Sequence, residues 1–123
     1  EYLRRRLSRN INTIKFRAQR ANIKFELDKE YLFSILPKDM KCPIFGIKFN
    51  LGFDKGEKKG KHNDNSSSPS LDKIEPHKGY VEGNVIWVSR KANVIKHDAS
   101  IAELEKIGNF YKLKSKEIFP YKS

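Results

Sequence analysis

Two side chains in the second half of the chain have the chemistry of a divalent-metal site. The stretch SLDKIEPHKGYVEGNVIWVSRKANVIKHD holds Asp72 near its start and Asn93 near its end. A hard cation such as Mg²⁺ takes only one or two protein oxygens and leaves its other positions to water and substrate phosphate. One carboxylate and one amide oxygen would therefore be enough. A cation held there could polarise a scissile phosphate and stabilise the leaving oxygen.

The segment around these residues predicts a strand, a loop, a strand and a helix, in that order. SLDKI and NVIWV read as short strands, and EPHKGYVEG between them is a loop with two glycines and a proline. Ser89 can cap a helix that runs through RKANVIKHD. Asp72 then lies on the first strand, and Asn93 lies about one turn inside the helix.

Histidines near this segment are candidates for a base or for a further ligand. His97 follows Asn93 by four residues, which places both on one side of the helix at ligand spacing. His77 lies in the loop five residues after Asp72 and could supply an imidazole, although a loop histidine among charged residues is more often solvated. We assign no role to His62.

The wider pattern resembles the ββα-metal core of HNH endonucleases, and it is more similar still to small phage-borne HNH-like enzymes. The matching pieces span most of residues 15 to 104, and their combination is specific although no single piece is. They are Arg17-Ala18, the turn CPIFG at 42–46, SPSLDKI at 68–74, KGYVEGNV at 78–85 and ANVIKHDAS at 92–100.

The resemblance implies an α+β fold with a ββα-metal (HNH-like) core, flanked by a basic N-terminal helix and a C-terminal helix. It implies hydrolysis of DNA phosphodiester bonds with Mg²⁺ or Mn²⁺. Carried over by position, it makes Asp72 and Asn93 metal ligands, with His97 as a further candidate. It makes Asn84 the residue that braces the loop between the strands, whereas the residues alone favour a simple turn residue after Gly83.

Lys73 departs from the family pattern. Many HNH sites place the general-base histidine directly after the aspartate, and a lysine with an ordinary pKa of about 10.4 is protonated at neutral pH. Burial or a metal could lower that pKa, but a cationic role at the phosphate asks for nothing unusual. We favour the cationic role, with His77 or a metal-bound hydroxide activating water. The candidate catalytic residues are thus Asp72, Lys73, His77 and Asn84.

Two other functions compete with the endonuclease. The first is a catalytically degenerate HNH-like module that binds nucleic acid without cutting it, with Lys73 as the mark of lost cleavage. The second is a basic structural protein, for which the pairing of Asp72 with Asn93 would be coincidental.

The charge of the chain favours nucleic acid as the partner, and the resemblance implies that this is DNA, with duplex DNA first. Among 123 residues, 26 are Lys or Arg and 15 are Asp or Glu, which gives a net charge of +11. No apolar run approaches the roughly 18 residues of a membrane span and no signal peptide opens the chain, so we expect no membrane partner and a cytoplasmic or otherwise intracellular protein. Cys42 is a lone cysteine, so no disulfide and no structural zinc are expected. The chain opens on Glu rather than Met, as a trimmed or partial chain would.

Residues 1–40 are predicted to form a basic helical arm. Up to Lys24 there are eight basic residues and one acidic residue, so this part carries +7. Apolar residues from Leu3 to Ala21 recur at helical spacing, and a second helix follows Asp28 and closes at Pro37. The arginines lie largely off the apolar stripe, where they either contact phosphate or form a solvated face: Arg4, Arg5, Arg6, Arg9, Arg17 and Arg20.

Residues 41–123 are predicted to form the core, joined to the arm as one structural unit. CPIFGIKF predicts a tight hairpin or turn, and the polar segment 50–69 predicts a long exposed loop. Ser100 and Glu103 form a capping-box pattern ahead of a terminal helix whose aromatic residues are expected in the core. Further phosphate contacts are predicted at Lys58, Lys59, Lys61 and Lys96, and Lys55 could join them; the loop lysines could equally be only solubilising.

Overall fold

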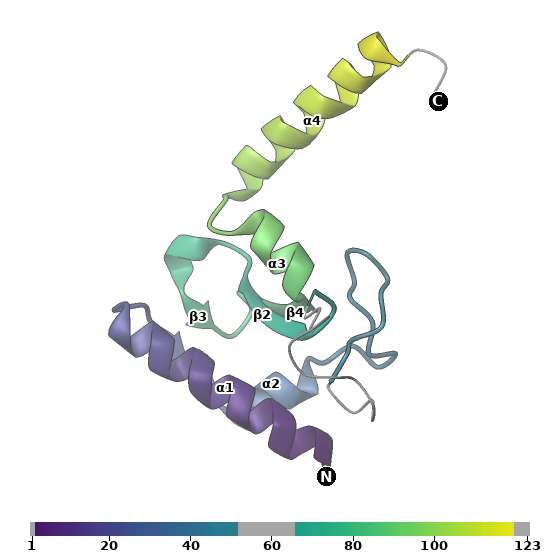
Figure 1. The fold of residues 1–123 in the computed structure, drawn as a ribbon. Helices are drawn as coiled ribbons and strands as arrows, with labels where there is room; N and C mark the ends of the chain where they lie inside the picture. The colour runs from purple at the N-terminus through teal and green to yellow at the C-terminus, as the bar shows by residue number, and fades with distance from the viewer. Residues whose placement is uncertain (1, 52–65, 120–123) are drawn as a thin grey trace.

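The protein has an α+β fold, which confirms the predicted class (Figure 1). The structure is a computed structural model and describes residues 2–51 and 66–119. Its elements, in chain order, are α1 (Tyr2–Arg20), β1 (Phe25–Glu26), α2 (Lys29–Ser34), β2 (Pro69–Lys73), the 3₁₀ helix η1 (Pro76–Lys78), β3 (Tyr80–Val81), β4 (Val85–Ser89), α3 (Arg90–Lys96) and α4 (Ile101–Ile118).

β2 and β4 form an antiparallel pair, with α3 packed against both. The register runs from Pro69 opposite Ser89 to Lys73 opposite Val85. This confirms the predicted order of strand, loop, strand and helix. The loop between the strands contains η1 and β3, and β3 pairs in parallel with β1. The loop is therefore tied to the N-terminal part of the chain.

The core lies between α1, α2 and the β2–β4 pair. Trp87 of β4 is fully buried, and its indole N–H donates to the carbonyl of Leu32 at 2.9 Å. Leu7, Ile11 and Ala18 of α1 are also buried, which confirms the middle of the apolar stripe predicted for the N-terminal helix, whereas Ala21 is exposed beyond the end of α1. Residues of α1 and α2 thus belong to the same buried cluster as Trp87.

Predicted caps fix where the later helices begin. Asp28 accepts a hydrogen bond from the Tyr31 N–H at 2.8 Å, and Ser89 accepts one from the Ala92 N–H at 3.2 Å. Ser100 takes part in a full capping box at the start of α4. Each cap satisfies an N–H that has no partner within its own helix.

The segment CPIFGIKF forms a tight turn, as predicted. A single antiparallel bridge joins Lys41 to Lys48, and Gly46 has a positive φ of 71°. Cys42 is buried, and its sulfur accepts a hydrogen bond from the Ser89 N–H at 3.2 Å. The turn is thus fastened to the end of β4, next to the start of α3.

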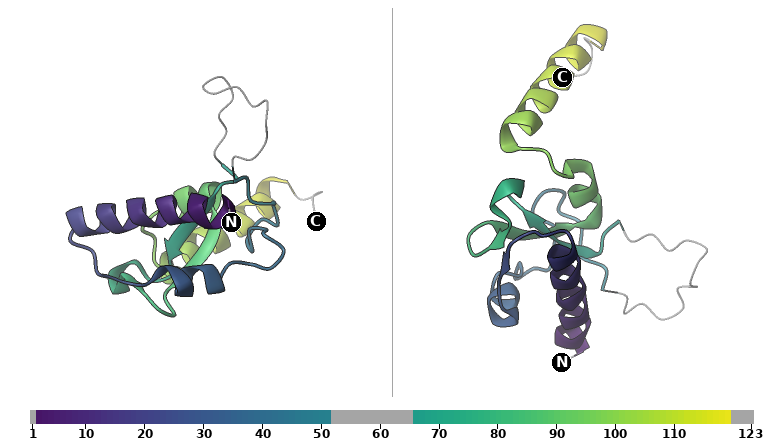
Figure 2. Two further views of the ribbon diagram at one scale, coloured as in Figure 1. Left: turned by 90° about the horizontal axis from the view of Figure 1, so that it is seen from below. Right: turned by 90° about the vertical axis from the view of Figure 1, so that its left-hand side faces the viewer.

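α4 projects away from the rest of the protein (Figures 1 and 2). No residue of α4 is buried, and Phe110 and Tyr111 are 56% and 64% exposed. The prediction that its aromatic residues lie in the core is therefore wrong. Helical spacing shows that a helix has an apolar face, but it does not show whether the same chain covers that face.

Candidate functional site

A hollow of about 330 Å³ lies where β2 ends beside α3. Its lining comes from β2, from the loop between the strands and from α3. The residues with ionisable or amide side chains among those that line it are Asp72, Lys73, Tyr80, Arg90, Asn93, His97 and Asp98. The structure thus brings both predicted oxygen donors to one hollow.

Asp72 is a buried carboxylate, with 6% of its surface exposed. The Nζ of Lys96 lies 3.3 Å from Asp72 Oδ1 and donates to the Lys73 carbonyl at 2.8 Å. Burial raises the pKa of Asp72, and the attraction of Lys96 only partly offsets this. Lys96 was predicted to contact phosphate, but its ammonium is instead held inside the site. The i to i+3 step from Asn93 to Lys96 places both side chains over β2.

Asn93 is oriented by the strand that carries Asp72. Its Nδ2 donates to Ser70 Oγ at 2.7 Å and more weakly to the Leu71 carbonyl at 3.4 Å. The amide nitrogen therefore faces β2, and within residues 2–51 and 66–119 no hydrogen bond uses the Asn93 Oδ1. An amide oxygen without a protein donor is suited to bind a cation or a water molecule.

Lys73 lies against an aromatic ring on the other side of the hollow. Its Nζ is 4.8 Å from the centre of the Tyr80 ring. Burial lowers the pKa of Lys73; the nearby Lys96 adds to this effect, while Asp72 and Asp98 oppose it. Burial also raises the pKa of the Tyr80 hydroxyl. The ammonium is thus positioned by a ring face rather than by a bidentate ion pair.

Asn84 fastens the loop between β2 and β4. Its Oδ1 accepts the Glu75 N–H at 3.0 Å, and its Nδ2 donates to the carbonyls of Glu75 and Gly79 at 3.0 and 2.8 Å. Gly79 has a φ of 76°, and a Cβ there would lie 2.9 Å from the Lys24 carbonyl oxygen. Asn84 is 6% exposed, so a buried side chain holds together the backbone at both ends of this loop segment.

The two histidines of this region differ in position. His77 lies exposed on η1 and does not line the hollow. His97 does line it, at the end of α3, with a φ of 50° and its N–H donating to the Asn93 carbonyl. No three His, Cys, Asp or Glu side chains gather as a metal cluster in the described part of the chain. The predicted ligands Asp72, Asn93 and His97 all line the hollow, and Asp98 lines it as well.

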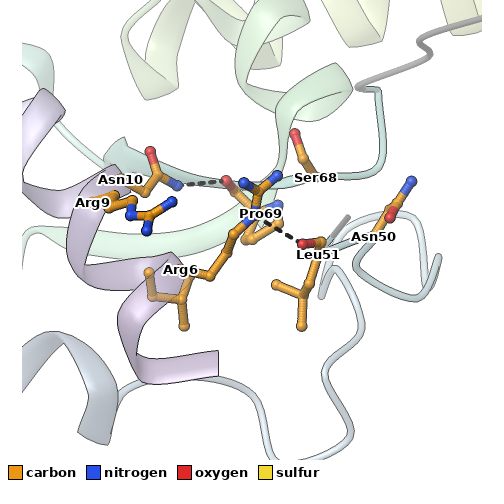
Figure 3. Close-up of a pocket in the computed structure, with 8 residues that line it drawn as sticks. Arg6, Arg9, Asn10, Asn50, Leu51, Ser68 and Pro69 are labelled. Atoms are coloured by element: carbon orange, nitrogen blue, oxygen red, sulfur yellow. Dashed lines mark hydrogen bonds between the residues drawn. The ribbon is translucent and has the colours of Figure 1, made fainter. Parts of the chain in front are cut away.

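The arginines of α1 that were predicted to contact phosphate have different surroundings in the structure. Arg4 pairs with Glu30 at 2.6 Å and lies over the Phe33 ring, so it helps to pack α1 on α2. Arg6 and Arg9 line a second hollow beside Leu51, where Arg6 Nε donates to the Leu51 carbonyl at 2.9 Å (Figure 3). Arg4 thus has a carboxylate partner in the structure, and its predicted phosphate contact stays a prediction.

The other basic residues predicted to contact phosphate lie in different places. Arg17 lines a third hollow, Arg5 is exposed on α1, and Arg20 lies over the Phe16 ring. The lysines predicted in the loop, Lys58, Lys59 and Lys61, and also Lys55, lie outside the described residues. Lining residues with polar or charged side chains that the sequence did not indicate include Tyr80, Arg90 and Asp98. Arg90 directly follows Ser89, the predicted cap of the helix that carries Asn93, and this position could have indicated that Arg90 lies near Asn93.

The chain has a relative in a bacteriophage. No family model and no solved structure matches it. The 29.0 kDa protein of the dda-modA intergenic region of Enterobacteria phage T4 is 30% identical over 100 residues, which cover 81% of this chain and 36% of the relative. The chain thus spans about a third of that protein. Among the described helices, none is long and apolar enough to cross a membrane.

Proposed function

We propose that this chain is a metal-dependent, HNH-like endonuclease that hydrolyses DNA, with β2, β4 and α3 as its ββα-metal core. The observation that supports this most is the meeting of one buried carboxylate and one amide oxygen in a single hollow. Asp72 comes from β2, and Asn93 comes from α3. The phage origin of the T4 relative agrees with this proposal, although that protein's name states no function.

The residues present fit a hard divalent cation, Mg²⁺ or Mn²⁺. Such an ion needs few protein oxygens, and Asp72 and Asn93 would supply them. Ser70 holds the Asn93 amide so that its oxygen stays available. Bound there, the ion would supply Lewis acidity at a phosphate oxygen. Lys96 balances the charge of Asp72 and would have to turn aside from Oδ1.

The other side chains bind and position the substrate in this proposal. Lys73, steadied by the Tyr80 ring, supplies a positive charge for a phosphate oxygen in the transition state. Asn84 keeps the loop after β2 in shape. His77 is exposed outside the hollow, so a base role for it loses support; His97 is the histidine that lines the hollow.

A non-cleaving DNA-binding module is the second candidate, and one observation favours it. The Lys96 ammonium lies 3.3 Å from the Asp72 carboxylate, so a fixed cation already lies beside this oxygen. If that pair is permanent, the scaffold would bind DNA without needing a metal ion.

Cleavage of supercoiled plasmid separates these two functions. We expect nicking in Mg²⁺ or Mn²⁺ and none in EDTA. Asp72→Asn and Asn93→Ala should each reduce the rate at least about a hundredfold, since each removes a proposed donor. Glu105→Gln on α4 is the control for loss of an acidic group and should cut normally. A parent protein that binds plasmid but never nicks it would refute the endonuclease and favour the binding module.

A further inference from the structure

Three hollows of the described surface adjoin one another and form one groove. The hollow at Arg6 and the hollow at Arg17 share Asn10, Ser68 and Pro69. The hollow at Arg17 and the hollow at Asp72 share lining from β2, β3 and α3, including Tyr80, Arg90 and Asn93. Their volumes are about 300, 270 and 330 Å³. The groove therefore runs along α1 and over β2 to the proposed metal site.

One stripe of α1 forms a wall of this groove. Arg6, Asn10 and Arg17 follow each other at i, i+4 and i+11, so they lie on one side of the helix. Asn10 also donates to the Pro69 carbonyl at 3.3 Å, which holds this side of α1 against β2 (Figure 3). At about 1.5 Å per residue, Arg6 and Arg17 are separated by roughly 16 Å along the helix. This corresponds to about five steps of a DNA duplex at 3.4 Å each.

The charge along the groove has one sign until its inner end. The first two hollows contain Arg6, Arg9, Arg17 and Arg90, and no acidic residue among the described ones that line them. Acidic residues appear only in the last hollow, where Asp98 accompanies Asp72, the proposed metal ligand. A polyanion could thus follow the arginines and meet a carboxylate only where a metal cation would screen it.

The arginines of the groove are available for a ligand. Within the described residues, Arg4 is the arginine that forms an ion pair with a carboxylate. Arg6 uses its Nε for the Leu51 carbonyl, which leaves the far end of its guanidinium for other acceptors. Arg17 and Arg90 are exposed beside the inner hollow. Guanidinium groups suit phosphate because they offer paired donors in a plane.

We propose that this groove binds the sugar–phosphate backbone of duplex DNA. Arg17 and Arg90 bind the phosphates next to the one that is cut, and Arg6 contacts the same strand about five nucleotide steps away. The inference rests on the proposed function for its direction, since the inner end is the Asp72 hollow. It goes further by naming the path of the strand and a contact, Arg90, outside the basic arm.

Salt-dependent binding of a 30-base-pair duplex in EDTA tests the path. Each lost phosphate contact should lower the slope of log K against log salt by about 0.9. Arg17→Gln with Arg90→Gln should therefore flatten the slope by about 1.8 and weaken binding at least about tenfold at 0.1 M salt. Arg17→Lys with Arg90→Lys should keep most of the slope, because it keeps the charges.

The matched control removes two charges from the projecting helix. Lys112→Gln with Lys116→Gln on α4 should leave the slope unchanged, and melting curves should show that all variants fold. Equal losses in the groove and α4 variants would overturn the proposed path, as would an unchanged slope in Arg17→Gln with Arg90→Gln. An acidic protein as the true occupant would give this last result.

Cleavage distinguishes this inference from the proposed function. If the parent protein never cuts in Mg²⁺ or Mn²⁺ but the groove variants lose slope as expected, the endonuclease fails and the groove stands. If the parent cuts but the groove variants bind and cut like the parent, the groove fails and the endonuclease stands.

Discussion

Burial shifts the pKa values of two neighbouring residues at the end of β2 in opposite directions. It raises the pKa of Asp72 and lowers the pKa of Lys73. Both shifts favour the neutral forms, so keeping both residues charged opposes folding. A cost of this kind is typical of a site built for binding or catalysis rather than for stability.

The raised pKa of Asp72 should make the stability of the metal-free protein depend on pH. The pKa of Asp72 is higher in the folded chain than in the unfolded chain, so the protonated carboxyl favours folding and its ionisation opposes folding. The stability that the protonated form contributes is therefore lost as pH rises from the ordinary aspartate range through the raised pKa. Asp72→Asn avoids this loss. In EDTA it should melt higher than the parent at pH 8, and the advantage should shrink toward pH 4.

An exposed aspartate provides the control for that comparison. Asp39→Asn replaces an exposed carboxylate and should lie within about 0.5 kcal/mol of the parent protein in stability. A variant Asp72→Asn that is equally destabilised at pH 4 and pH 8 would mean that the pair with Lys96 outweighs the cost of burial.

Lys73 gives opposite pH profiles for its two possible roles. As a cation at the phosphate it works protonated, so cleavage should fall as pH rises through its lowered pKa. Lys73→Arg should then keep activity within about tenfold and lose that alkaline fall. As a base it works deprotonated, so cleavage should rise over the same range and Lys73→Arg should be inactive. The measurement is the initial nicking rate of plasmid against pH for both proteins.

Among the elements, the loop between β2 and β4 depends on one side chain. Asn84 bonds three backbone groups of this loop, and it is buried. Asn84→Ala leaves those groups without partners, at about 1–3 kcal/mol for each group that stays buried. We expect a loss on the order of 3 kcal/mol in the free energy of unfolding, measured by urea denaturation. Asn109→Ala, exposed on α4, should cost less than about 0.5 kcal/mol; similar losses in both would contradict the bracing role.

Much of this element structure could be predicted from the sequence, because its signals are local. Caps at Asp28, Ser89 and Ser100 act within three residues of themselves, and the apolar stripe of α1 shows which side is buried. Tertiary neighbours were harder to predict. Lys96 looked like a surface cation, and His77 looked close to Asp72 in sequence, but the strand pair and the turn into η1 decide where their side chains lie.

Across the whole molecule, the charged residues are distributed differently in the projecting helix α4 and in the body of the protein, by which we mean the elements from α1 to α3. α1 carries arginines along the groove, whereas α4 mixes both signs, with three glutamates and four lysines between Ile101 and Ile118. Its apolar residues, such as Ile107 and Tyr111, are more than half exposed. The proposed DNA contacts therefore lie on the body of the protein and not on α4.

Titration with Mn²⁺, followed by the electron paramagnetic resonance signal of the free ion, measures whether Asp72 and Asn93 hold a cation. If Asp72 and Asn93 share one cation, the parent protein should bind one Mn²⁺ per chain. Asp72→Asn and Asn93→Ala should each weaken that binding at least about tenfold, and Asp39→Asn should not. A parent protein that binds no Mn²⁺, or variants at Asp72 and Asn93 that bind it as the parent does, would contradict the account.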